Sequence, residues 1–104
     1  MSFATWAGRS KFDYTGDIAI GTKISFGKTR IITVTAQQYA ALRETFLEQV
    51  VHVGTSFNNP RPGSIGEWLL NNVTRTAIAS YVAPILIREG YAVRESKTEI
   101  RIIR

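Results

Sequence analysis

The spacing of hydrophobic residues changes along this chain and divides it into elements. In residues 17–34, apolar positions alternate with polar or small ones on both sides of a turn at Gly27, which predicts a β-hairpin. In residues 36–49 they recur every three or four positions, as in an amphipathic helix. Residues 50–54 are a β-branched run that ends in glycine, which predicts a short strand.

Capping motifs indicate where the helices begin. Thr35 and Gln38 have the spacing of a capping box, in which two residues satisfy each other's free N–H groups. Ser64 and Glu67 repeat that spacing. Thr74 is placed to cap a third helix. These caps predict helices over residues 36–49, 65–72 and 75–88.

Turn residues and a final apolar alternation complete the pattern. Residues 55–63 are rich in Asn, Pro and Gly, which predicts a loop. Gly90 suits the left-handed residue that ends a helix. Residues 91–94 and 99–103 then predict two strands joined by the polar residues 95–98. We therefore expect one α+β domain, residues 1–104, made of an arm (1–16), a β-hairpin (17–34) and a body of three helices, a short strand and a C-terminal β-hairpin (35–104).

The arm, residues 1–16, shows no regular period but holds four aromatic residues, with Arg9 and Lys11 among them. One interpretation is a basic arm whose rings stack on bases while its cations meet phosphates. The other, which we favour, is that the rings are buried against the domain, because apolar side chains usually reach a core.

The charge balance favours an anionic partner. Thirteen Lys and Arg against eight Asp and Glu give a net charge of +5, and the sequence pI is near 10.0. The excess lies at both ends, because residues 1–34 carry five basic and two acidic side chains and residues 61–104 carry seven and four. Composition alone does not separate nucleic acid from an acidic protein surface.

No catalytic or cofactor motif stands out. The chain has no cysteine, which excludes thiolate nucleophiles and cysteine-bound metals. The one histidine, His52, has no orienting partner or nucleophile near it in sequence. Residues 27–29 resemble the end of a phosphate-binding loop, but the spacing is one residue too long and a strand follows. With no signal peptide or membrane span in the pattern, we expect a cytoplasmic protein that is not an enzyme and needs no metal, cofactor, membrane or small-molecule substrate.

From residue 34 onward, the predicted elements follow the order helix, strand, helix, helix and two strands. In this order the segment resembles the winged-helix superfamily. The local likeness is greatest in residues 73–82 and 86–94, which look like a recognition helix that runs into a wing. The resemblance implies that the N-terminal part of the third helix enters the major groove of DNA, and that DNA is a more expected partner than RNA.

The residues singled out by the resemblance and the charge pattern are polar or basic. On the third helix, Arg75, Thr76 and Ser80 would read bases or hold the backbone. On the wing, Arg94 and Lys97 would grip adjacent phosphates. The first hairpin would extend this surface with Lys23, Lys28 and Arg30. We therefore expect a small DNA-binding, regulatory protein that acts through phosphate contacts.

Two features oppose base reading by the third helix. Its outward positions, among them Ala83 and Ile87, are mostly apolar, and Pro84 lies inside it. A helix that is apolar on nearly all sides is usually covered, either by the N-terminal hairpin or by a second subunit. The alternative function is therefore a protein-interaction module, a small regulator or inhibitor that uses this helix to form a homodimer or to bind a partner.

Overall fold

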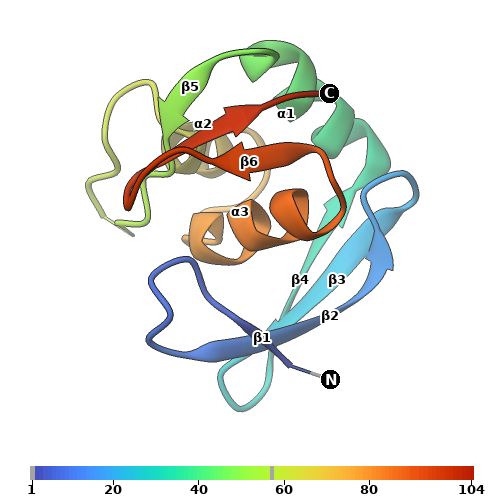
Figure 1. Ribbon diagram of the computed structural model, residues 1–104. Coiled ribbons are helices and arrows are strands. Elements are labelled where there is room, and N and C mark those ends of the chain that lie inside the picture. Colours follow the sequence, from blue (N-terminus) through green and yellow to red (C-terminus); the bar gives the residue numbers. More distant parts are fainter. Residues whose placement is uncertain (1, 57) are drawn as a thin grey trace.

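The computed structural model describes residues 2–56 and 58–104 and confirms the α+β class. Its helices are α1 (Ala36–Phe46), α2 (Ile65–Asn72) and α3 (Ala79–Arg88). One antiparallel sheet contains, in spatial order, β1 (Phe3–Ala4), β2 (Lys11–Asp17), β3 (Gly21–Phe26) and β4 (Arg30–Thr35). A second contains β5 (Val50–His52), β7 (Glu99–Ile102) and β6 (Ala92–Arg94), again in spatial order. Figure 1 shows α3 between the two sheets.

The N-terminal sheet contains the predicted hairpin, formed by β3 and β4 around a turn at residues 27–29. It also contains β2, which the sequence did not distinguish from the rest of the arm. Residues 18–20 were expected to be strand and instead form a turn. The turn is held by Ile18 N–H, which donates to the Glu89 carboxylate, and by Ile20 N–H, which donates to the Asp17 carboxylate.

The predicted starts of the first two helices are confirmed. Thr35 and Gln38 form both hydrogen bonds of the capping box. The hydroxyl of Ser64 accepts the N–H of Glu67, while the Glu67 carboxylate accepts from Gly63. None of the helices in the described part of the chain is long and apolar enough to cross a membrane.

Several predicted boundaries were wrong. The two C-terminal strands are each one residue shorter than predicted, and three other elements differ by two to four residues. The first helix ends at Phe46 rather than at residue 49, because Glu48 has a φ of 63° and its N–H donates to Ile102 of β7. The short strand ends at His52 rather than at residue 54, since Gly54 turns the chain with a φ of +70°. The third helix begins at Ala79 rather than at residue 75.

The late start of α3 follows from how α2 ends. The N–H of Thr74 donates back to the Leu69 carbonyl, so residue 74 belongs to the end of α2 and does not cap α3. Ile78 occupies the N-cap position and provides no side-chain hydrogen bond. At the other end of α3, Gly90 has the predicted left-handed conformation, with a φ of +82°.

Helix α3 is the centre of the hydrophobic core. Ala79, Val82, Ala83, Ile85 and Leu86 are all at most 1% exposed. On the side of the N-terminal sheet, the Tyr81 ring stacks on Phe26 at 4.6 Å and packs on Phe12 at 5.3 Å, measured between ring centroids. The N-terminal sheet therefore covers the side of α3 that carries Tyr81, and Ala83, on the outward face, is buried within the chain itself.

The aromatic residues of the arm join the same core. Trp6 and Phe12 are 6% and 3% exposed, and Phe3 and Tyr14 are half-buried. The structure thus confirms the interpretation in which these rings are buried, and leaves the two cations of the arm, Arg9 and Lys11, exposed.

Candidate nucleic-acid interface

Trp6 ties the N-terminal segment to the C-terminal hairpin. Its backbone N–H donates to the Ser80 carbonyl at 2.9 Å, and its indole N–H donates to the Lys97 carbonyl at 2.6 Å. The Arg94 guanidinium lies 3.9 Å from the centre of the indole ring and donates to the Trp6 carbonyl. These contacts hold the arm loop, residues 5–10, against the hairpin loop, residues 95–98.

Pro84 explains why the Ser80 carbonyl is available. In a regular helix this carbonyl would accept the N–H of residue 84, but proline has none. The free carbonyl accepts the N–H of Trp6 instead, so the proline inside α3 creates the point at which the arm binds.

The proline loop, residues 55–63 without the undescribed residue 57, approaches the hairpin loop from the other side. Just before it, Val53 N–H donates to the Thr98 carbonyl at 2.9 Å, and the Val53 carbonyl accepts from Gly66 at 2.8 Å. Gly66 has no room for a side chain, since a Cβ there would lie 1.8 Å from the Gly54 carbonyl oxygen. Close packing of β5 on α2 therefore fixes where the proline loop begins.

The three loops enclose a basic groove of about 430 Å³. The arm loop contributes Arg9, the proline loop Arg61 and the hairpin loop Lys97, and all three side chains are exposed. The half-buried His52, at the end of β5, also lines the groove. The described lining residues are Trp6, Ala7, Arg9, His52, Val53, Gly54, Thr55, Ser56, Asn59, Arg61, Lys97 and Thr98.

The electrostatics of this groove favour an anion. None of its described lining residues is acidic. Of the nearby carboxylates, Glu95 is neutralised by its ion pair with Arg101 at 2.6 Å. Glu99 and Glu67 accept hydrogen bonds from the neutral Ser96 hydroxyl and Gly63 N–H and keep their charge, outside the groove lining. Three cations that converge from separate segments raise the local positive potential and can neutralise phosphate charges.

The site residues predicted from the sequence are spread over several places. Lys97 lies in the groove, while Arg94 lies behind it with its guanidinium on Trp6. Thr76 accepts a hydrogen bond from Arg30 at 3.0 Å, and the neighbouring Arg75 is exposed. Ser80 is half-buried beside the arm.

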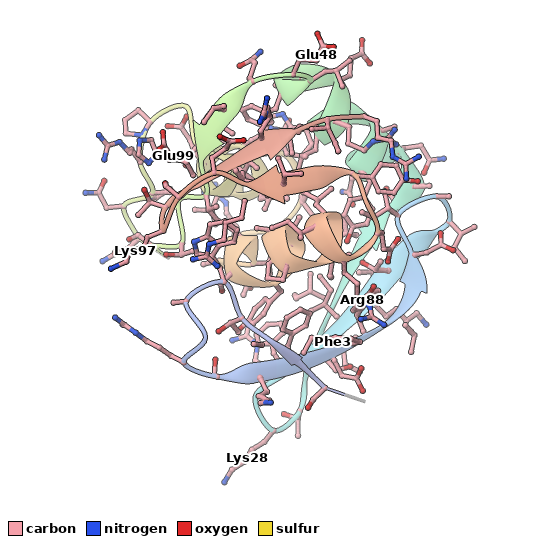
Figure 2. All side chains as sticks on the ribbon, in the orientation of Figure 1. Phe3, Lys28, Glu48, Arg88, Lys97 and Glu99 are labelled. Carbon is pink, nitrogen blue, oxygen red and sulfur yellow. The ribbon has the colours of Figure 1, made fainter. Side chains whose placement is uncertain are left out.

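The remaining predicted residues belong to the N-terminal sheet. Lys28 and Arg30 line a second hollow of about 400 Å³ with Lys11, but Asp13 is part of that lining as well. Lys23 lies farther along β3, between Thr15 and Thr33. Figure 2 shows Lys28 and Lys97 on different sides of the molecule, so the predicted residues do not form one patch.

Sequence reasoning did not select Arg9 or Arg61 as site residues. The sequence places Arg9 in a basic arm and Arg61 between two prolines in a predicted loop. Their convergence with Lys97 depends on contacts between segments distant in sequence, such as Trp6 with Lys97 and Val53 with Thr98, for which the sequence offers no signal.

No other chemistry gathers in the described residues. They contain no group of three or more His, Asp or Glu side chains placed to hold a metal ion. The perturbed groups are tyrosines in the core. Burial and the hydrogen bond to Glu89 raise the pKa of Tyr14 to about 12, and burial raises the pKa of Tyr39 and of Tyr81.

Comparisons with models of protein families, with curated proteins and with solved structures found no match to this chain.

Proposed function

We propose that this protein binds nucleic acid through phosphate contacts made by the basic groove and the cations around it. The observation that carries the proposal is the convergence of Arg9, Arg61 and Lys97 on one groove without an acidic lining residue among those described. Phosphate contacts supply most of the affinity in such proteins and carry no sequence information by themselves.

The resemblance to winged-helix proteins supports this proposal in part. The elements α1, β5, α2, α3, β6 and β7 follow the expected order. Of the predicted wing residues, Lys97 lies in the groove, whereas Arg94 lies behind it on Trp6. Base reading by α3 has less support, because the N-terminal sheet covers the helix. We therefore propose binding with little sequence preference, to DNA or to RNA.

The alternative function, association through α3, loses its main support. It relied on exposed apolar residues of the helix, but Ala79 and Ala83 are 1% and 0% exposed and Ile87 is half-buried. The chain itself occupies the surface that a partner would need.

The salt dependence of binding tests the proposal. The affinity for a fluorescent oligonucleotide should fall steeply between about 50 and 200 mM salt, because each neutralised phosphate releases counterions. Lys97→Gln should lower the slope of log affinity against log salt by about 1. Lys23→Gln removes the same charge from an exposed position of β3, outside the groove, and should leave the slope unchanged.

Two results would contradict the proposal. One is an affinity that barely changes with salt. The other is an equal loss of slope in both variants, since that would mean that net charge, rather than the groove, governs binding.

A further inference from the structure

The shape of the basic groove restricts what can enter it. Its walls come from three separate loops, and its volume of about 430 Å³ is near the lower end of the ~300–1,000 Å³ range of ligand pockets. A nucleic-acid duplex is far wider, since the major groove alone is about 12 Å across. A duplex could touch the rim, whereas only a single chain could pass between the loops.

The distribution of the cations agrees with this restriction. Arg9, Arg61 and Lys97 belong to different walls. Cations on one convex face suit the outside of a duplex, whereas cations on facing walls surround a single backbone.

The walls also carry polar groups that a duplex bound at the rim through its phosphates would not contact. The side chains of His52, Thr55, Asn59 and Thr98 line the groove and form no hydrogen bond with the rest of the described chain. They are free to bind the sugar hydroxyls or base edges of a strand that enters. In a duplex, paired and stacked bases would not be presented at this depth.

We propose that the basic groove binds one nucleotide of a single strand, so that the protein prefers single-stranded nucleic acid and overhangs to blunt duplex. This inference rests on the proposed function and names its ligand class. Arg9, Arg61 and Lys97 hold the backbone, while Asn59 and Thr98 contact the sugar or base of the nucleotide between them.

Competition between oligonucleotides of one sequence tests the inference with the unaltered protein. A short single strand, a blunt duplex and a duplex with a single-stranded overhang are titrated by fluorescence anisotropy at one salt concentration, as DNA and as RNA. We expect the single strand to bind at least about tenfold tighter than the blunt duplex, and the overhang to restore most of the difference.

Substitutions of uncharged residues distinguish the contribution of the polar groove walls to binding from that of the phosphate contacts. Asn59→Ala and Thr98→Val should weaken single-strand binding severalfold without changing its salt slope, because neither removes a charge. Thr33→Val, on an exposed position of β4, is the matched control and should bind as the original protein does.

The possible results distinguish this inference from the proposed function. Equal or tighter binding of the blunt duplex, with a steep salt slope, would overturn the single-strand preference and leave nucleic-acid binding intact. Absence of binding to every oligonucleotide at low salt would overturn both.

Discussion

At the scale of single residues, several side chains connect parts of the chain that are distant in sequence. Trp6 joins α3 to the hairpin loop with one backbone and one indole hydrogen bond, and Pro84 supplies the free carbonyl for the first of these. Glu89 has a similar role at the other end of α3. Its carboxylate accepts from the Tyr14 hydroxyl at 2.6 Å and from Ile18 N–H at 2.9 Å, which fixes the N-terminal sheet on the helix.

Burial of Tyr14, together with its hydrogen bond to Glu89, makes the stability of the fold decrease at alkaline pH. Folding raises the pKa of Tyr14 from 10.0 to about 12. The unfolded chain therefore loses this proton first, so the stabilisation is complete below pH 10 and is lost as the pH rises through about 12. Tyr14→Phe should cost about 1 kcal/mol near neutral pH, where the hydrogen bond is lost.

Urea unfolding at a series of alkaline pH values checks this prediction. Between pH 10 and 12, Tyr14→Phe should lose stability less steeply than the original protein, by up to about 1.4 kcal/mol per pH unit. Equal slopes for the two proteins would show that Tyr14 titrates alike in the folded and unfolded states, and would contradict the assigned contact.

At the scale of elements, local sequence signals predicted the starts of α1 and α2 correctly. They failed for α3 and β2, whose positions are determined by contacts between residues distant in sequence. Thr35 and Ser64 cap α1 and α2 as expected, because capping is a contact between residues three apart. The Thr74 side chain could also cap a helix, but Thr74 lies at the end of α2. Helix α3 begins at Ala79, where packing in the core determines its start. Strand β2 was missed although Phe12 and Tyr14 alternate with polar residues, because this alternation spans only residues 11–15 of an otherwise irregular arm. Its pairing with β3 establishes it.

The close contact between the end of β5 and the start of α2 is a further test at this scale. Gly66→Ala would place a Cβ 1.8 Å from the Gly54 carbonyl oxygen. The backbone must move to accept it, which should cost about 3 kcal/mol or more, at the upper end of overpacking effects.

The matched control is Gly63→Ala, where a Cβ would meet no atom within 4 Å although φ is +79°. It should cost only the strain of a left-handed alanine, about 1–2 kcal/mol. Chemical denaturation gives both values, and an equal loss in the two variants would mean that steric contact at Gly66 contributes nothing.

At the scale of the whole molecule, the N-terminal sheet changes what the body can do. The element order alone predicted a helix free to enter DNA, but the sheet covers α3 and the arm loop is held against the hairpin loop. The same docking brings Arg9 to Lys97 and Arg61, and so forms the groove. The fold class was predictable because it follows local patterns, whereas the site was not, because it exists only after segments from both ends and the middle of the chain have packed together.

The basic groove is therefore the central element of the proposed function, and its position is accessible to NMR. Backbone amide shifts recorded during titration with a short single-stranded oligonucleotide would locate the bound ligand directly. The predicted result is that the largest changes fall in the described residues with an amide in the ranges 6–9, 55–56, 58–59 and 97–98 and at Arg61, while the amides around Lys23 and Glu48 stay unchanged. Changes concentrated at the β3–β4 turn, or no change at low salt, would contradict it.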